Sequence, residues 1–178
     1  GDQEALNQEM MKAARQGRGR LVSGLLRGGA DPQTRDESGE TGLDIALKRG
    51  HRAAAEAFLD HGITGYNREE SLQQCDNNRE RINQLNDKLF FAARSGDNQG
   101  VEAALEEGAE ITSRDFSDYT AGLYESAEAG HQSVVLTLLN WGLDVNIKDR
   151  WRQTALIEAA DSGHLACLQT LLDHGALT

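Results

Sequence analysis

Apolar residues recur along this chain at spacings of three and four, in short stretches that lie between two glycines. Within residues 130–142, for example, the apolar positions include Val134, Val135, Leu138 and Leu139. This spacing places the apolar side chains on one face of an α-helix. The same arrangement, with the second glycine twelve positions after the first, covers residues 17–29, 50–62, 96–108, 130–142 and 163–175. We therefore predict five amphipathic helices, each with a glycine at either end.

A second short helix is predicted directly before each of these stretches. Their sequences are MMKAARQG, LDIALKRG, LFFAARSG, LYESAEAG and LIEAADSG, and small residues that allow close helix approach recur inside them. The units follow one another at intervals of 33, 46, 34 and 33 residues, measured between their first glycines. Because one helix pair cannot bury its own apolar face, we predict a solenoid in which neighbouring pairs stack.

Several segments of the chain resemble the ankyrin repeat family. They are GETGLDIALKRGHRAAAEAFLDHG (39–62), RQTALIEAADSGHLACLQTLLDHGA (152–176) and GLDVNIKD (142–149). The resemblance covers nearly the whole chain except about residues 66–85, and it implies an all-α ankyrin-repeat solenoid of stacked helix pairs with short β-hairpin fingers. The T-P-L-H-x-A element of the family is present only as TGLDIA and TALIEA, without its proline and histidine. This departure leaves open how the hairpin turns are braced. Tyr124 falls where the family has its buried histidine, and we interpret it as covering a neighbouring finger.

The interval of 46 residues contains an insertion of 13 residues between the second and third repeats. The segment 65–86 is polar and rich in helix-forming residues, and the repeat after it opens with NDKLFFAARSGD, much as the first opens with NQEMMKAARQGR. Both openings indicate starting repeats without a finger. We predict repeats one and two in residues 1–64, a helical connector in 65–86, and repeats three to five in 87–178. One continuous stack with a long outward loop is the alternative, and the sequence leaves both open.

Charge and motifs exclude several classes of function. A formal net charge of −11 makes the chain a poor candidate for binding nucleic acid or an anionic membrane. The five histidines and two cysteines show no metal-binding spacing, and no nucleophile, base and orienting residue can be proposed together. We therefore expect no enzyme, no cofactor and no metal. Cysteine usage suits a reducing compartment, so we expect a cytoplasmic location, with the nucleus as the alternative. We also expect a monomer. The chain has no initial Met and ends just after a repeat, which we interpret as a piece of a longer protein.

The family resemblance implies that a partner binds the concave side, which is formed by the fingers and the ends of the first helices. These ends carry cations in the first three repeats, at Arg15, Lys48, Arg49 and Arg94, and acids in the last two. These charged helix ends form either a functional charge gradient or a set of ordinary helix ends whose cations oppose the helix dipole.

Exposed aromatic residues form the second candidate feature of this side. Trp151 is predicted at a finger tip. Trp141 is predicted at the solvent-exposed end of a helix whose apolar face is already occupied by leucines. We predict that these two tryptophans form one binding patch. The alternative is that Trp141 folds down over the next finger as local cover. The candidate partner-binding residues are Arg15, Lys48, Arg49, Arg94, Phe116, Tyr119, Trp141, Arg150, Trp151 and Arg152.

Asn146 is a candidate for hydroxylation, because Leu138, Asp144, Val145 and Asn146 resemble the spacing at which ankyrin-repeat asparagines are hydroxylated. The alternative is that Asn146 only closes the hairpin turn.

The leading hypothesis is a protein–protein interaction module that binds a peptide or a folded partner through its concave face and fingers. Two alternatives remain. One is a sensor domain that binds a small nucleotide-like molecule, and the other is a regulatory domain that packs on a catalytic domain of a larger parent protein.

Overall fold

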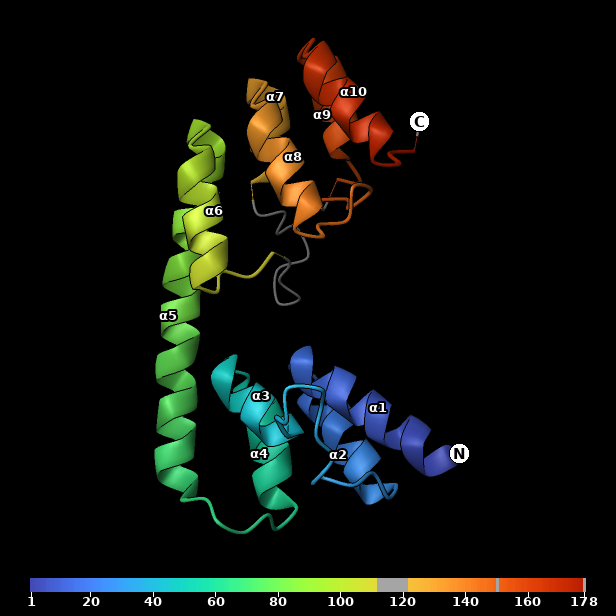
Figure 1. The fold of residues 1–178 in the computed structure, drawn as a ribbon, viewed down its shortest axis with the longest axis vertical. Helices are drawn as coiled ribbons and strands as arrows, with labels where there is room; N and C mark the ends of the chain where they lie inside the picture. The colour runs from blue at the N-terminus through green and yellow to red at the C-terminus, as the bar shows by residue number, and fades with distance from the viewer. Residues whose placement is uncertain (112–121, 150, 178) are drawn as a thin grey trace. The chain divides into compact units, whose positions relative to one another are not determined.

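The computed structural model describes residues 1–111, 122–149 and 151–177, and helices dominate these ranges (Figure 1). Phe116, Tyr119 and Arg150 lie outside the described residues. The helices are α1 (Asp2–Arg15), α2 (Gly19–Arg27), α3 (Gly42–Lys48), α4 (Arg52–Asp60), α5 (Arg68–Ser95), α6 (Asn98–Glu107), α7 (Leu123–Ala129), α8 (Gln132–Asn140), α9 (Ala155–Asp161) and α10 (Leu165–Asp173). The predicted all-α fold of stacked helix pairs is confirmed.

The chain divides into two compact units, Gly1–Ile82 and Asn83–Thr178, whose boundary falls inside α5. The first unit contains α1 to α4 and the first half of α5. The second contains the rest of α5 and the helices α6 to α10. Within each unit, first helices pack against first helices and second helices against second helices, as in α1 with α3 and α6 with α8. The proposed division into residues 1–64, 65–86 and 87–178 stays a prediction.

The core of the first unit is built around large side chains from all four of its short helices. Met10, Val22, Leu43 and Phe58 are at most 1% exposed. Gly42 opens α3 directly against the Phe58 ring, and a Cβ at that position would lie 2.4 Å from Phe58 Cζ. The glycine therefore sets the distance between α3 and its own partner helix.

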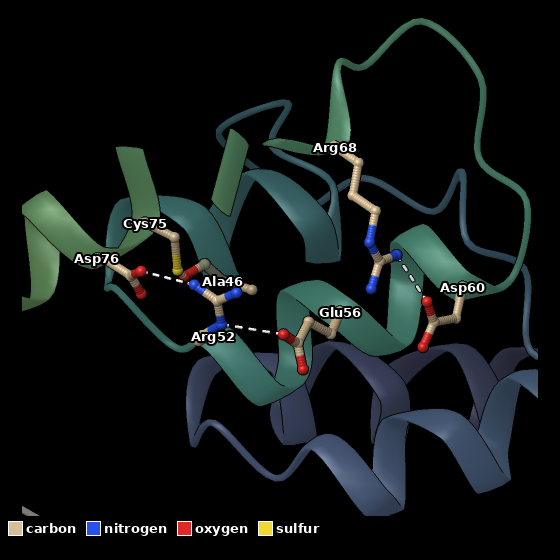
Figure 2. Close-up of polar contacts among 7 residues, drawn as sticks. All are labelled: Ala46, Arg52, Glu56, Asp60, Arg68, Cys75 and Asp76. Atoms are coloured by element: carbon tan, nitrogen blue, oxygen red, sulfur yellow. Dashed lines mark hydrogen bonds and ion pairs between the residues drawn. The ribbon is translucent and has the colours of Figure 1, made fainter. Parts of the chain in front are cut away.

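The first half of α5 covers the last repeat of the first unit (Figure 2). Leu72 and Cys75 belong to the core of this unit, and the Cys75 Sγ lies 3.8 Å from the carbonyl oxygen of Ala46. Arg52 of α4 reaches Asp76 of α5 at 2.6 Å while it also pairs with Glu56. The inserted segment thus stands where the first helix of a following repeat would stack.

Helix α5 also begins the third repeat, because it continues without interruption to Ser95 (Figure 1). Leu89, Ala92 and Ala93 from its second half enter the core of the second unit. Around them pack buried apolar side chains that are fully shielded from solvent: Val101, Leu123, Val134, Leu138 and Leu171. A single helix therefore supplies a buried face to each unit.

Contacts between consecutive repeats are formed by a histidine that covers a glycine of the repeat before it. The ring of His131 lies 2.7 Å from where a Cβ on Gly96 would stand, and His164 covers Gly130 at the same distance. His51 covers Gly17 in the first unit. All three glycines have positive φ, a conformation that glycine adopts at no steric cost. The histidines of the repeat motif are therefore packing residues.

In repeats one and three, an asparagine on the first helix fixes the loop that leaves the repeat. Asn7 and Asn86 each stand ten positions before the first glycine of their repeat. The Oδ1 of Asn7 accepts a hydrogen bond from the backbone N–H of Asp31 at 2.8 Å, and that of Asn86 accepts from Glu110 at 2.7 Å. In both repeats an amide side chain on a helix holds the loop that leaves the repeat.

The described fingers contain turns with little strand pairing. An isolated antiparallel bridge joins Arg35 and Thr41. An aspartate braces the finger in each case, because Asp36 accepts hydrogen bonds from the backbone N–H groups of Ser38 and Glu40, and Asp149 accepts from Trp151 and Gln153. These aspartates therefore stabilise the finger turns in a chain whose repeats lack the proline and histidine of the family motif.

Candidate partner-binding surface

The helix-end cations of the first unit lie beside acids of the neighbouring finger. Arg15 Nη2 is 3.8 Å from Asp36 Oδ2, and Lys48 Nζ is 3.5 Å from Glu40 Oε1. Arg49 Nη1 donates to the carbonyl oxygen of Arg15 at 3.4 Å. The finger acids therefore offset part of the positive charge that the sequence placed on this side. Exposed pairs of this kind contribute little to stability.

Arg94 stands exposed near the end of α5 in the second unit. Arg15, Lys48 and Arg49 belong to the first unit and Arg94 to the second. The structure therefore groups only the first three cations in one unit. A single gradient across all four residues stays a prediction.

Five carboxylates gather on repeats four and five, and we name them the acidic surface: Glu125, Glu128, Asp149, Glu158 and Asp161. Burial raises the pKa of Glu158 above its usual value, and the charges of the other four carboxylates raise it further. Glu125 Oε2 is buried and has no hydrogen-bond partner among the described residues. The helix-end pattern identified Glu128 and Asp161, while Glu125, Glu158 and Asp149 were missed. Glu125 and Glu158 stand five residues before their repeat's first glycine, a spacing that the sequence already contained.

Both tryptophans lie in the second unit and both are exposed. Trp141 follows the last residue of α8 and is 45% exposed, as expected for a residue outside the apolar face. Trp151 lies in the turn braced by Asp149 and is 69% exposed. The adjacent Arg152 is exposed and has φ 63°, the left-handed conformation that a tight turn requires. The joint patch of the two rings stays a prediction.

Asn146 uses its whole side chain to hold the end of the following repeat. Its Oδ1 accepts from the backbone N–H of Leu177 at 2.8 Å, and its Nδ2 donates to the carbonyl oxygen of Gly175 at 3.3 Å. Asn7 and Asn86 make the equivalent contact in repeats one and three, so the side chain has a structural role in each case. Hydroxylation of Asn146 stays a prediction.

Tyr124 covers the finger of the fifth repeat from α7. Its hydroxyl lies 2.6 Å from the carbonyl oxygen of Ile147 and 2.5 Å from that of Gln153. The phenol has one proton, so the two carbonyls share a single donor. Burial raises the pKa of Tyr124 above its usual value, and the Asp149 carboxylate raises it further. The interpretation of Tyr124 as cover for a neighbouring finger agrees with these contacts.

Comparison with known proteins decides the family. The profile of ankyrin repeats, described as three copies, matches residues 10–115 and 89–177. The chain belongs to the ankyrin repeat family. Ankyrin repeats are generally protein-interaction modules and the family is typically non-catalytic. The count of five repeats stays a prediction.

Several relatives of this ankyrin chain are larger proteins. It is 28% identical to the B-cell lymphoma 3 protein homolog of Mus musculus over 88% of its own length and 33% of the relative. It is 26% identical to a putative ankyrin repeat-containing protein of Treponema pallidum, over 70% of its own length and 47% of that protein. A match of 33% identity to the L-asparaginase of Dirofilaria immitis covers half of the chain and 15% of the enzyme. The chain therefore spans less than half the length of these relatives.

Two features are absent from the residues that the structure describes. No helix among them is both long and apolar enough to cross a lipid bilayer. No three histidine, cysteine, aspartate or glutamate side chains in the described ranges are grouped so that they could hold a metal ion.

Proposed function

We propose that this ankyrin repeat chain binds a protein or peptide partner, and that its second unit contacts a basic segment of that partner. The observation that carries the proposal is Trp151, a large aromatic side chain 69% exposed at a finger tip. Trp is among the residues that contribute most binding energy at protein interfaces. A finger tip that faced only water would not need such a side chain.

The acidic surface supplies the second part of the proposal. Burial raises the pKa of Glu158, and repulsion from the other four carboxylates raises it further. Lysine and arginine side chains of a partner would relieve this repulsion and speed association at low salt. Asp149 connects the two features, because it belongs to the acidic surface and also holds the backbone of Trp151.

The test compares partner capture by the wild-type chain and by three variants. Trp151→Ala and Trp141→Ala should each weaken partner binding by more than about 1 kcal/mol. Each should lower the free energy of unfolding by less than about 1 kcal/mol, because both side chains are exposed. Glu158→Gln should also weaken binding, while leaving the melting temperature equal or higher because one mutual repulsion is removed.

Leu136→Ala is the matched control, because Leu136 is 39% exposed on α8 and lies outside the acidic surface. A protein captured from source-cell lysate by the wild type and this control, and lost with Trp151→Ala, supports the proposal. Its binding should also weaken as salt rises. Equal capture by all four variants would contradict the proposed surface.

A regulatory role beside a catalytic domain is the second candidate. The relatives include an L-asparaginase and the serine/threonine-protein kinase 12 of Arabidopsis thaliana, and the matched segments span 15% and 19% of those proteins. In such a parent protein the partner would be a domain of the same polypeptide. In this case Trp151→Ala in the full parent protein should change its catalytic activity. Neither the wild type nor the variant should capture a separate partner protein.

A further inference from the structure

The described fingers of repeats two and five share one backbone turn. In repeat two, the backbone N–H of Asp36 donates to the carbonyl oxygen of Glu40, and that of Gly39 donates to the carbonyl oxygen of Asp36, each at 3.0 Å. In repeat five, Asp149 and Arg152 make the same two hydrogen bonds at 3.1 and 3.0 Å. The aspartate side chain also accepts two backbone N–H groups in each finger. The two finger tips can therefore be compared position by position.

The tip of the fifth finger carries large side chains where the tip of the second carries small ones. Ser38 and Gly39 of the second finger correspond to Trp151 and Arg152 of the fifth. Gly39 has φ 80° and Arg152 has φ 63°, so the shared turn requires a left-handed residue at this position. Glycine adopts this conformation at no steric cost, whereas a residue with a Cβ is strained in it. Arg152 therefore destabilises a turn that glycine would fit.

Within the part of the chain that the structure describes, no side-chain contact offsets the strain at Arg152. Its side chain is exposed, and its guanidinium has no ion-pair or hydrogen-bond partner among those residues. In the second finger, by contrast, Arg35 Nη1 donates to the carbonyl oxygen of Gly39 at 2.7 Å. Strained residues that the fold does not require occur mainly at functional sites. The strained arginine therefore points to a ligand of the guanidinium.

We propose that Arg152 binds a side-chain carboxylate of the partner, so that the segment recognised by the second unit carries an aspartate or glutamate beside its basic residues. This inference rests on the proposed function, because it takes Trp151 and the acidic surface as parts of one binding face. Trp151 is the neighbour of Arg152 in the turn and is 69% exposed, so one segment can contact both side chains. The planar guanidinium donates two parallel hydrogen bonds to a carboxylate, which gives the contact its selectivity.

The surroundings of Arg152 favour an anion with a single charge. Acidic residues outnumber basic ones in the second unit, and Asp149 of the acidic surface lies in the same turn. A carboxylate brings one negative charge to this place, whereas a phosphate group brings about two at neutral pH. Because the repulsion from the unit grows with the charge of the ligand, a carboxylate fits this finger better than a phosphate.

The two charge signs also set the register of the bound segment. Its carboxylate lies at the finger tip, and its basic residues lie over the acidic surface on α7 and α9. A segment bound in a shifted register would place like charges together, and such contacts are strongly unfavourable. Arg152 is therefore a specificity-determining residue as well as a contact.

Three single substitutions separate the charge of Arg152 from its backbone conformation. Arg152→Gly removes the charge and the strain, whereas Arg152→Gln removes the charge and keeps a side chain at the left-handed position. Lys148→Gln is the matched control, because it removes an exposed cation of the same finger outside the tip. Arg152→Gly should raise the melting temperature of the second unit, and the other two variants should leave it unchanged. A lower melting temperature for Arg152→Gly would overturn the proposal, because the arginine would then stabilise the fold.

The ligand is selected from short random peptides displayed on phage, with the full chain as bait. The wild type and Lys148→Gln should select peptides in which an aspartate or glutamate stands at a fixed separation from basic residues. Both Arg152 variants should select the basic residues without that acidic residue. An acidic residue that is missing from the wild-type peptides, or retained with the Arg152 variants, would overturn the inference and leave the proposed function intact. Loss of the basic residues alone would contradict the proposed function, and the absence of any enriched peptide would overturn both.

A selected peptide, synthesised again, measures the contact itself. Replacing its acidic residue by the matching amide should weaken binding to the wild type about tenfold or more, and should leave binding to Arg152→Gln unchanged. An equal loss with both chains would overturn the assignment of the carboxylate to Arg152. Phosphoserine at the same position should bind the wild type more weakly than the carboxylate does. Tighter binding of the phosphoserine peptide would overturn the carboxylate as the ligand.

Discussion

At the scale of single residues, Tyr124 shows how this chain replaces a motif that it lacks. The family motif places a histidine where this sequence has tyrosine, and the phenol reaches the backbone of the next finger instead. One hydroxyl then serves two carbonyl oxygens that lie 2.6 and 2.5 Å away. The neutral phenol is the form that this site holds, so its ionisation is coupled to unfolding.

We predict that Tyr124→Phe lowers the free energy of unfolding of the second unit by about 1 kcal/mol at neutral pH. The raised pKa of Tyr124 means that its stabilising effect is complete below the usual value of 10.0 and is lost as pH rises beyond it. The difference between wild type and variant should therefore shrink above pH 10, by up to about 1.4 kcal/mol per pH unit.

Denaturant unfolding followed by tryptophan fluorescence measures this quantity, because Trp141 and Trp151 both belong to the second unit. Tyr66→Phe, in the first unit, is the control and should leave the fluorescence transition unchanged. A constant difference between pH 8 and pH 11 would show that Tyr124 ionises freely.

At the scale of helices, two separate requirements select glycine in this chain: a left-handed backbone and close contact with the next repeat. Gly130 and Gly163 have almost the same backbone, with φ 79° and 76°. A Cβ on Gly130 would lie 2.7 Å from His164, whereas a Cβ on Gly163 would meet nothing within 4 Å. The pair therefore separates backbone strain from contact between repeats.

Gly163→Ala should cost about 1 to 2 kcal/mol of unfolding free energy, the cost of a left-handed non-glycine residue. Gly130→Ala should cost clearly more, because the His164 ring must move as well. The same fluorescence-detected unfolding gives both values. Equal costs for the two variants would mean that the histidine contact contributes nothing to stacking.

The helix pairs could be predicted from the sequence because glycine spacing and apolar periodicity both mark them. The continuity of α5 was missed, although no glycine or proline interrupts residues 66–95 and a helix therefore has no reason to stop. Comparison with the first repeat suggested a boundary at residue 86, where the helix has none. The candidate site was predicted less completely. Exposure of Trp141 and Trp151 followed from their positions, but the ion pairs of Arg15 and Lys48 depend on where the fingers fold, which spacing does not reveal.

At the scale of the whole molecule, each unit contains one buried thiol. Cys75 lies in the core of the first unit and Cys167 in that of the second, and neither is measurably exposed. Burial, aided by Asp76, raises the pKa of Cys75 to about 11, and burial alone raises the pKa of Cys167. Because the thiolate is the reactive form, labelling of either cysteine requires its unit to open.

Thiol labelling should therefore report the two units separately. Leu138→Ala removes a fully buried side chain from the second unit and should cost about 2 to 5 kcal/mol there. It should speed labelling of Cys167 many-fold and leave that of Cys75 nearly unchanged. Phe58→Ala should have the reverse effect.

Mass spectrometry of labelled peptides gives the two rates in one sample. Wild-type protein at neutral pH serves as the reference, and both cysteines should react slowly. If Leu138→Ala accelerated both cysteines equally, the two units would open as one, which would favour the continuous stack over two separate ones.

The paired asparagines, Asn7 and Asn86, have a consequence for how such a chain can change over generations. In the first repeat of each unit, an amide side chain holds the loop that leaves the repeat. A stretch of coding sequence that begins just before Asn86 therefore encodes a stack with a ready-made beginning. Duplication or transfer of that stretch into another gene would deliver a folded unit without requiring a new first repeat to be invented.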